Sequence, residues 1–254
     1  MAVKRAQSVT RALSILDAIA ARQPIGVSAL AKLLDEDRSA VQRAVMTLAD
    51  AGWVRMAPEP PTRWELSAHI FTIAHLPHSS ANLRARARRV LDQLCDETGE
   101  TAFLAVPDVN RFVVIEAAES PHVLRMVSRV GQVIASPESA TQRALLPYFD
   151  VRRQTAMLGR APTESDLREF AATRARRYAL SAGDVMPGAT NLAATIFDAH
   201  AQPVAALVIS GPSERLTPQR HATVGALVAS AAATLSRGAA PLASARAMTE
   251  PLRT

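Results

Sequence analysis

The sequence is poor in cysteine and in aromatic residues. A single cysteine, Cys95, stands among 254 residues, and one cysteine forms no intrachain disulfide and supplies no multi-cysteine zinc or iron–sulfur site. Aromatic side chains make up only 4% of the chain, which leaves few rings to stack on unpaired bases. These shortages exclude a disulfide scaffold, fit a reducing cytoplasm and disfavour binding to RNA or single-stranded DNA.

Long apolar runs are missing as well. The longest weakly apolar run, residues 222–235, is shorter than the roughly 20 residues that span a bilayer, so it is interpreted as a helix that faces a core. The opening residues 1–11 are basic, but no apolar run follows them, so they lack the pattern of a secretory signal. We therefore expect a cytoplasmic protein with no membrane partner.

The common enzyme signatures are also absent. The chain has no GxSxG, GxGxxG, GxxxxGKS/T or HExxH segment, the marks of many hydrolases, nucleotide-binding enzymes and zinc proteases. His69, His75 and His78 include no i, i+4 pair and Pro77 interrupts them, so packing or surface histidines are favoured over a metal site. Cys95 has no neighbouring base in sequence and is interpreted as a small buried apolar residue. We expect no catalytic residue, metal or cofactor.

What remains is the composition of a globular protein, with 48% hydrophobic and 20% charged residues. A chain of 254 residues is long enough for one or two domains. Its charges are unevenly placed: residues 1–91 hold 13 basic and 7 acidic residues, and residues 92–254 hold 16 of each. The excess positive charge lies in the first third, which indicates a polyanion partner there.

The first third predicts a three-helix bundle followed by a hairpin. Residues 8–21 carry apolar side chains at helical spacing, with Ser8 as the N-cap. Shorter helices are predicted over 28–34 and 38–51, and strands over 53–56 and 62–66 enclose a proline-rich tip that forbids helix. Three short helices and a β-hairpin, or wing, are typical of a winged helix-turn-helix.

The rest of the chain predicts an α+β domain. A polar hinge at 78–82 precedes a helix over 83–97. Strand-like segments at 101–106, 111–118, 188–197 and 203–210 lie on both sides of helical stretches at 137–149 and 163–176, and a last helix covers 217–236. Strands grouped at both ends favour an α+β sheet over an alternating parallel one. We therefore expect domains at 1–81 and 82–237 and a flexible tail at 238–254.

The predicted helix at 38–51 carries the sharpest functional signal. At about 100° per residue its core face and outer face separate. The core face holds Val41, Ala44, Val45 and Leu48, and the outer face holds Ser39, Gln42, Arg43 and Met46, with Arg38 and Thr47 beside it. Arginine and glutamine read guanine and adenine edges bidentately, so Ser39, Gln42 and Arg43 are predicted to contact bases. Arg38 and Thr47 are placed nearer the DNA backbone.

Arginines outside this helix extend the predicted interface. Arg55 and Arg63 flank the wing tip, and Arg5 and Arg11 lie at the amino end, where arginines suit phosphate or minor-groove contacts. For each of these four arginines, a solvated side chain without a DNA contact is an equally good interpretation. The opposing hypothesis makes the helix face a solvated surface and the chain a small-molecule-binding or enzymatic α+β protein whose first domain serves protein interaction.

Several segments together resemble the IclR family of bacterial transcriptional regulators. In family order they are SVTRALSILDAIA, VSALAKLLDEDRSAVQRAVMTLADAGWV, LDQLCDETGETAFLAV, LRMVSRVGQ, MPGATNLAATIFD and PVAALVISGPSERLTP, between about residues 7 and 236. The TGET, RVG and SGPSERLTP segments make the resemblance specific. It implies an N-terminal winged helix-turn-helix, a linker helix and a C-terminal effector-binding domain of GAF-like α+β fold.

The resemblance also implies partners. Family members act as dimers or tetramers on palindromic operators in double-stranded DNA, and a small organic molecule, often a carboxylic acid, alters the response. Contacts between protomers are expected through the helix at 83–97 and the first helix. A third interpretation leaves the second domain without a ligand, as an oligomerisation module.

The effector-binding residues are assigned by this resemblance. They are Met126, Ser139, Gln142, Ser181, Asn191, Val208 and Ser210. Where relatives carry a histidine, a threonine and a glycine–lysine pair, this chain has Pro137, Ser139, Gln142 and Arg143. Asn191 replaces a cysteine, Ser181 an acidic residue and Val208 a serine, so the pocket has been rebuilt. None of the predicted anchors is charged, so an acid would be held by neutral donors.

The turn before the helix at 38–51 departs from the family as well. Asp35 and Glu36 stand where relatives carry a glycine and an apolar residue. Because aspartate tolerates the left-handed backbone region, the turn is expected to persist.

Overall fold

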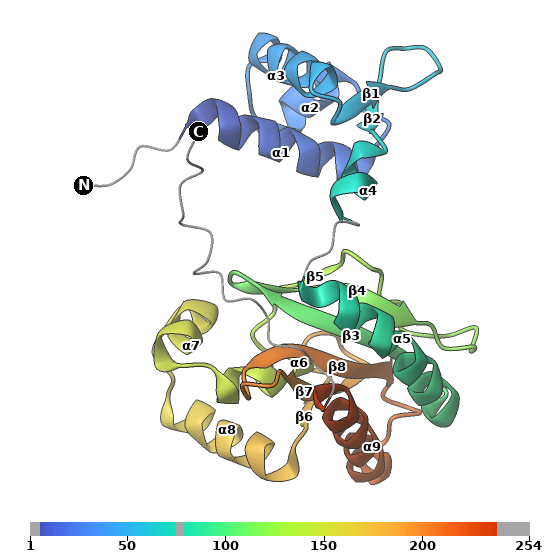
Figure 1. Ribbon diagram of the computed structural model, residues 1–254, viewed down its shortest axis with the longest axis vertical. Coiled ribbons are helices and arrows are strands. Elements are labelled where there is room, and N and C mark those ends of the chain that lie inside the picture. Colours follow the sequence, from blue (N-terminus) through green and yellow to red (C-terminus); the bar gives the residue numbers. More distant parts are fainter. Residues whose placement is uncertain (1–5, 75–78, 238–254) are drawn as a thin grey trace. The chain divides into compact units, whose positions relative to one another are not determined.

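The computed structural model describes residues 6–74 and 79–237. Its contacts divide the chain into two compact units, Met1–His78 and Ser79–Thr254 (Figure 1), whereas the sequence analysis placed the boundary after residue 81. The expected tail at 238–254 lies outside the described residues.

The first unit is a helical bundle with a β-hairpin. Helices α1 (Gln7–Arg22), α2 (Val27–Leu34) and α3 (Arg38–Asp50) precede the strands β1 (Val54–Met56) and β2 (Trp64–Leu66), and the short helix α4 (His69–Ala74) follows. The two strands pair antiparallel. The winged helix-turn-helix prediction is thus confirmed, but Ser8 is not the N-cap, because α1 begins at Gln7 with Ala6 in the cap position.

The apolar faces of these helices meet in one core. It contains Ile15 and Ile19 of α1, Leu30 of α2, Val41 and Val45 of α3, and Trp64 of β2. Full burial of an aliphatic side chain contributes about 1.5–3 kcal/mol. This core is what holds the polar face of α3 toward solvent.

The turn between α2 and α3 keeps its geometry despite the two acidic residues. Asp35 ends α2 in the left-handed region with φ of 51°, as its short polar side chain permits. Asp37 is the N-cap of α3, and its carboxylate accepts a hydrogen bond from the Ala40 backbone N–H at 2.9 Å.

The second unit is built on an antiparallel sheet. In the described residues the strand order is β5-β4-β3-β8-β7-β6, and every neighbouring pair is antiparallel. The strands are β3 (Thr101–Asp108), β4 (Arg111–Ala118), β5 (Val133–Ile134), β6 (Ala179–Ala182), β7 (Ala189–Phe197) and β8 (Pro203–Pro212). The predicted α+β class is confirmed, although the short strands β5 and β6 were not anticipated.

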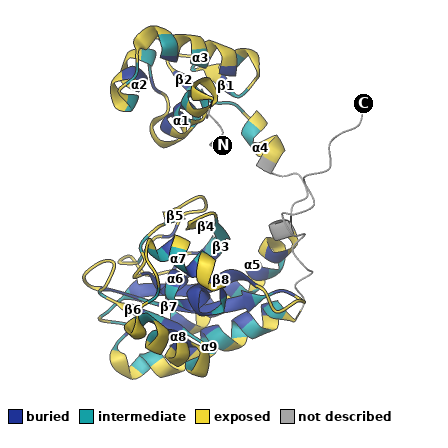
Figure 2. Cartoon of the chain, turned by 90° about the vertical axis from the view of Figure 1, so that its left-hand side faces the viewer, coloured by how far each residue is buried: buried dark blue, intermediate teal, exposed yellow. Residues whose placement is uncertain are grey.

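Helices cover both faces of this sheet. Helices α5 (Ser79–Thr98) and α9 (Pro218–Ser236) share one core with it. The other core holds α6 (Ala140–Leu145), the 3-10 turn η1 (Leu146–Tyr148), α7 (Val151–Leu158) and α8 (Glu164–Arg176). Figure 2 shows the buried residues gathered between these layers.

Two details of the helical layer differ from the sequence analysis. The stretch predicted at 137–149 is split between Leu145 and Leu146 into α6 and η1, just before Pro147, which lacks the N–H that an α-helix needs. Helix α7 was not anticipated. Among the described helices none combines the length and apolar character of a membrane span.

Candidate nucleic-acid interface and ligand pocket

The outer face of α3 is polar and open to solvent. Val41, Val45 and Leu48 are buried beneath it. The exposed residues of the helix are Arg38, Ser39, Gln42, Arg43, Met46, Thr47 and Asp50. The helical period therefore brings the five predicted α3 contacts to one surface, because the core fixes which side of the helix is hidden.

Hydrogen bonds organise the start of this surface. The Ser39 hydroxyl donates to the Asp37 carboxylate, and Arg43 Nη1 donates to Ser39 Oγ at 3.3 Å. The bond from Ser39 is the main reason that the pKa of Asp37 lies below its usual value, with the Ala40 N–H next. The Thr47 hydroxyl donates to the Arg43 carbonyl at 2.9 Å, so it is already engaged with the helix backbone.

The remaining predicted arginines differ from one another. Arg11 is mostly buried and its guanidinium lies 2.9 Å from Glu36, which ties α1 to the turn before α3. Arg55 on the wing lies 2.7 Å from Glu65 of the paired strand. Arg63 is exposed and has no ion pair among the described residues. Arg5 lies outside the described residues.

The second unit contains a cavity of about 180 Å³ between the sheet, α6 and the loops around Met126 and Val185. Five of the seven predicted effector residues line it: Met126, Ser139, Asn191, Val208 and Ser210. Gln142 and Ser181 do not line it, although both are buried, and neither Gln142 Nε2 nor Ser181 Oγ has a hydrogen-bond partner in the described part of the chain.

Strand register explains why Asn191 and Ser210, which are distant in sequence, meet at this cavity. Ser181 pairs with Asn191, Asn191 with Ser210, and Ser210 with Thr101. Residues paired across neighbouring strands point to the same face of a sheet, so these four form a polar row across β6, β7, β8 and β3. An apolar row that includes Val208 and Phe103 runs beside it.

Sequence reasoning missed all of the remaining lining. It consists of Phe103, Val127, Ser128, Gln132, Ile134, Ala140, Thr141, Val185, Met186 and Ala189. Several of these lie in irregular loops, where no periodicity marks which side chains turn inward. No charged side chain belongs to the described lining.

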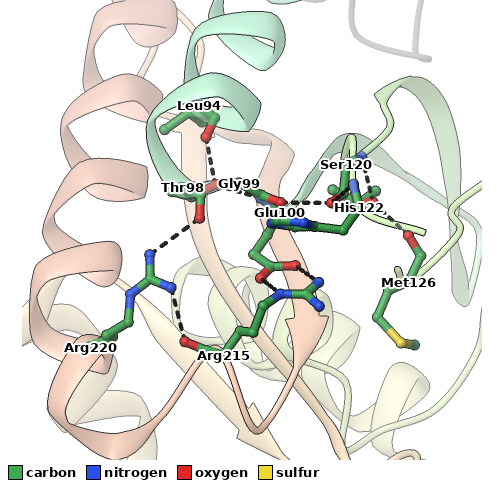
Figure 3. A network of polar contacts seen from close by, with 10 residues as sticks. Leu94, Thr98, Gly99, Glu100, Ser120, His122, Met126, Arg215 and Arg220 are labelled. Carbon is green, nitrogen blue, oxygen red and sulfur yellow. Dashed lines mark hydrogen bonds and ion pairs between the residues drawn. The ribbon is translucent and has the colours of Figure 1, made fainter. Parts of the chain in front are cut away.

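A hydrogen-bond network fixes the wall that carries Met126 (Figure 3). Thr101 Oγ1 donates to the Met126 carbonyl at 2.5 Å and accepts from the Ser120 N–H at 3.1 Å. The Ser120 hydroxyl in turn donates to the Gly99 carbonyl at 2.6 Å. The loop after β4 is therefore bound to the start of β3.

An ion pair stabilises the same region, at the start of β3. The Glu100 carboxylate is 1% exposed and accepts from Arg215 Nε at 2.6 Å and Nη2 at 2.7 Å. Its hydrogen bonds raise the pKa of Arg215. These two residues lie in the TGET and SGPSERLTP segments, so the ion pair joins the start of β3 to the turn after β8.

A larger and more open cleft of about 630 Å³ lies beside α6 and α8. Its three arginines are all paired: Arg143 with Asp184 at 2.8 Å, Arg160 with Asp166 and Arg176 with Glu169, both at 2.5 Å. Arg143, which stands at the family's lysine position, therefore faces this cleft and not the smaller cavity. The smaller cavity differs from the cleft because no charged or ion-paired side chain belongs to its described lining.

His69 and Cys95 have ordinary surroundings. His69 lies edge-on to Trp53, with ring centres 5.1 Å apart, and His75 and His78 lie outside the described residues. Cys95 is buried, donates to the Glu119 carbonyl and has a pKa raised by burial. Within the described ranges no group of three or more His, Cys, Asp or Glu side chains is arranged to hold a metal.

Comparisons with known proteins match both units. The model of the IclR helix-turn-helix domain covers residues 8–58, and that of the bacterial transcriptional regulator IclR C-terminal domain covers residues 77–237. The transcriptional repressor IclR of Escherichia coli is 32% identical over 245 residues, which is 91% of this chain and 89% of that protein. The acetate operon repressor of Salmonella typhimurium is 30% identical over 240 residues, with 89% and 87% covered.

Solved structures agree on the fold. An IclR transcriptional regulator from Silicibacter matches with a TM-score of 0.76 and 24% identity, over 92% of this chain and 98% of its own. An IclR homologue from Microbacterium hydrocarbonoxydans, complexed with 4-hydroxybenzoate, matches with a TM-score of 0.77 and 16% identity, over 91% and 99%.

Proposed function

The chain belongs to the IclR family of bacterial transcriptional regulators, and from that premise we propose that it binds a palindromic operator and changes its response when a small organic molecule occupies the second unit. The predicted family, the winged helix-turn-helix and the role as a regulator are confirmed by the family matches. The opposing hypothesis of an enzyme is set aside, because these relatives are regulators.

The observation that carries the DNA-binding proposal is the exposed polar face of α3. Gln42 and Arg43 stand on it above a fully buried core, within the segment that matches the family's helix-turn-helix. In our proposal this helix enters the major groove, where Gln42 and Arg43 reach base edges and Arg38 and Thr47 lie near phosphates. Arg63 and Arg55 then place the wing against the backbone or minor groove, as Arg5 does from the amino end. Arg11 contributes indirectly, by holding α1 against the turn.

A titration against the promoter region beside the protein's own gene tests this function. We expect specific binding that weakens steeply as salt rises, because neutralised phosphates release counterions. Binding of equal strength to unrelated duplexes of the same length would contradict the proposal.

We place the protein in the cytoplasm, where its operator is, and propose that it self-associates. A two-fold dimer doubles the base contacts of a single recognition helix and matches a palindrome. Val9 and Leu13 of α1 support this, because they lie one turn apart and are each 57% exposed. A monomer in light scattering at micromolar concentration, with and without operator, would contradict it.

The proposed effector is small. An apolar cavity of about 150 Å³ accommodates benzene, so about 180 Å³ suits a single ring or a short chain. Its polar atoms would meet Asn191, Ser210 and Ser139, and its apolar part Met126 and Val208. A carboxylate would be held by neutral donors, because the described lining is uncharged. Gln142 and Ser181 would then support the pocket from outside its lining.

A thermal-shift screen of single-ring and short-chain acids and their amides tests the effector proposal. A ligand that binds only the folded protein raises the melting temperature, and the shift grows with the logarithm of the ligand concentration relative to its dissociation constant. If no compound of this size shifts the melting temperature, the interpretation of the second unit as an oligomerisation module gains support.

A further inference from the structure

Three residues at the start of α3 form one chain of hydrogen bonds. Arg43 Nη1 donates to Ser39 Oγ at 3.3 Å, and the Ser39 hydroxyl donates to Asp37 Oδ2. Asp37 also accepts from the Ala40 N–H at 2.9 Å as the N-cap of the helix. The guanidinium on the exposed face is therefore connected through a hydroxyl to the N-cap residue of the helix.

The donor and acceptor count of Ser39 limits what else it can do. A serine hydroxyl has a single proton, and here that proton is directed to Asp37 while the oxygen accepts from Arg43. Ser39 thus has no proton left to donate to a base. A guanidinium has five N–H groups in a planar fork, so Arg43 keeps donors for a bidentate contact with guanine after one is used.

The charge of Asp37 strengthens this arrangement. Its carboxylate is held in the ionised form, since the bonds from Ser39 and Ala40 lower its pKa. A hydrogen bond to an ionised acceptor is stronger than a neutral one, and it polarises the serine oxygen that Arg43 contacts. Arg43 itself has no ion pair among the described residues, unlike Arg55, whose guanidinium lies 2.7 Å from the Glu65 carboxylate.

We propose that Ser39 is a positioning residue that fixes the Arg43 guanidinium for base reading, with Asp37 as its anchor, and that Ser39 does not itself read a base. The inference rests on the proposed DNA-binding function. Residues 39 and 43 then act together on a single base pair. Holding Arg43 in place strengthens that contact, because a long side chain that is ordered before binding loses less conformational entropy when it docks.

The test is a double-mutant cycle on DNA. An operator is first selected from random duplexes with the wild-type full-length protein, and dissociation constants are then measured for single base-pair changes along it. The proteins compared are wild type, Ser39→Ala, Arg43→Ala, the double variant and Ser39→Thr, which keeps the hydroxyl. Ser230→Ala, an exposed helical serine of the second unit, is the matched control.

We expect Ser39→Ala to weaken operator binding about threefold to tenfold, the range of one net hydrogen bond, and to relax preference at the same base pair as Arg43→Ala. The double variant should bind no more weakly than Arg43→Ala alone. Ser39→Thr, which keeps the hydroxyl, should show the wild-type preference at that base pair. Circular dichroism should remain unchanged, because Asp37 still caps the Ala40 N–H.

Three outcomes would overturn the assignment. Loss of preference at a different base pair, with additive effects, would make Ser39 a base reader. Unchanged affinity and preference in Ser39→Ala would make the hydrogen bond irrelevant to recognition. If selection with the wild-type protein yields no preferred sequence, the proposed function fails, and the positioning role fails with it.

Discussion

The first unit exposes its candidate binding side chains to solvent, whereas the second unit turns its own toward an internal cavity. In the first unit they stand on the outer face of one helix, above a core that includes Val41 and Val45. In the second unit they form a row across four strands beneath α6, where Ser181, Thr101 and Ser210 are buried. A surface that binds a large polyanion can be built within one helix, whereas a cavity needs several elements in register.

Because of this difference, a substitution on the α3 face should change binding without changing the free energy of unfolding. A substitution among the buried polar residues of the second unit should change both. Substituting an exposed side chain on α3 removes no buried contact, so its effect on folding is within about 0.5 kcal/mol. Substituting a buried, hydrogen-bonded polar residue of the second unit, such as Thr101, leaves its partners without hydrogen bonds, which costs about 1–3 kcal/mol each. Each prediction below tests that contrast.

The largest effect is expected for Glu100→Gln. This change leaves the Arg215 guanidinium without its buried counter-charge, and breaking such a pair costs about 3 kcal/mol of unfolding free energy. Both tryptophans, Trp53 and Trp64, lie in the first unit, so their fluorescence reports on that unit alone. In urea, the circular-dichroism transition should move to lower concentration while the tryptophan transition stays in place.

Glu119→Gln is the matched control for this change. Glu119 pairs with Arg125 at 3.1 Å, but both side chains are substantially exposed, so the loss should be below about 1 kcal/mol. If the tryptophan transition of Glu100→Gln shifts together with the circular-dichroism transition, the two units unfold as one and the contrast is wrong.

The sequence allowed the first unit to be predicted more fully than the second. Helical periodicity alone separates Val41 and Val45 from Gln42 and Arg43, because the information lies within thirteen residues of α3. Arg11 was predicted as a DNA contact on the same footing as Arg55 and Arg63, and the sequence did not reveal its ion pair with Glu36, which comes from a turn between two other helices. Side-chain pairing across elements is not visible in a local pattern.

The pocket was located by resemblance and not by periodicity. Asn191 and Ser210 were placed in it, and the register of β7 with β8 brings them side by side. Gln142 was also expected there, but α6 presents Ser139, Ala140 and Thr141 to the cavity instead. The role of Thr101 depends on an irregular loop that ends near Met126, and no sequence signal predicts where such a loop closes.

The next largest effect is expected for Arg43→Ala on operator affinity. Loss of a bidentate base contact costs about 1–3 kcal/mol, roughly a 5- to 150-fold weaker binding, and relaxes preference at one operator position. The free energy of unfolding should stay within about 0.5 kcal/mol of wild type. Fluorescence anisotropy against single-base operator variants measures the first effect, and urea denaturation the second. Unchanged affinity and unchanged preference would show that this helix docks differently.

A smaller effect is expected for Asn191→Ala on the ligand that the thermal-shift screen identifies. Removing its amide should weaken that ligand about tenfold, the contribution of one or two hydrogen bonds, without changing the operator affinity of the unliganded protein. Gln142→Ala sharpens the test, because Gln142 is buried but does not line the cavity. It should change ligand affinity less than Asn191→Ala. Calorimetry that gives undiminished affinity for Asn191→Ala would place the ligand elsewhere.

The smallest effect concerns the two wing arginines, which differ in how their charge is compensated. Arg63 is exposed without an ion pair in the described residues, whereas Arg55 lies 2.7 Å from Glu65. A free guanidinium on a phosphate releases a counterion, so Arg63→Ala should lower the slope of log affinity against log salt by about 1 and weaken all sequences alike. Arg55→Ala should lower the salt slope less, because Glu65 already offsets part of that charge.

The control is Arg152→Ala, which changes an exposed arginine of the second unit and should leave the slope unchanged. Equal slopes for Arg55→Ala and Arg63→Ala would mean that DNA displaces Glu65 and that the ion pair does not limit the charge of the wing.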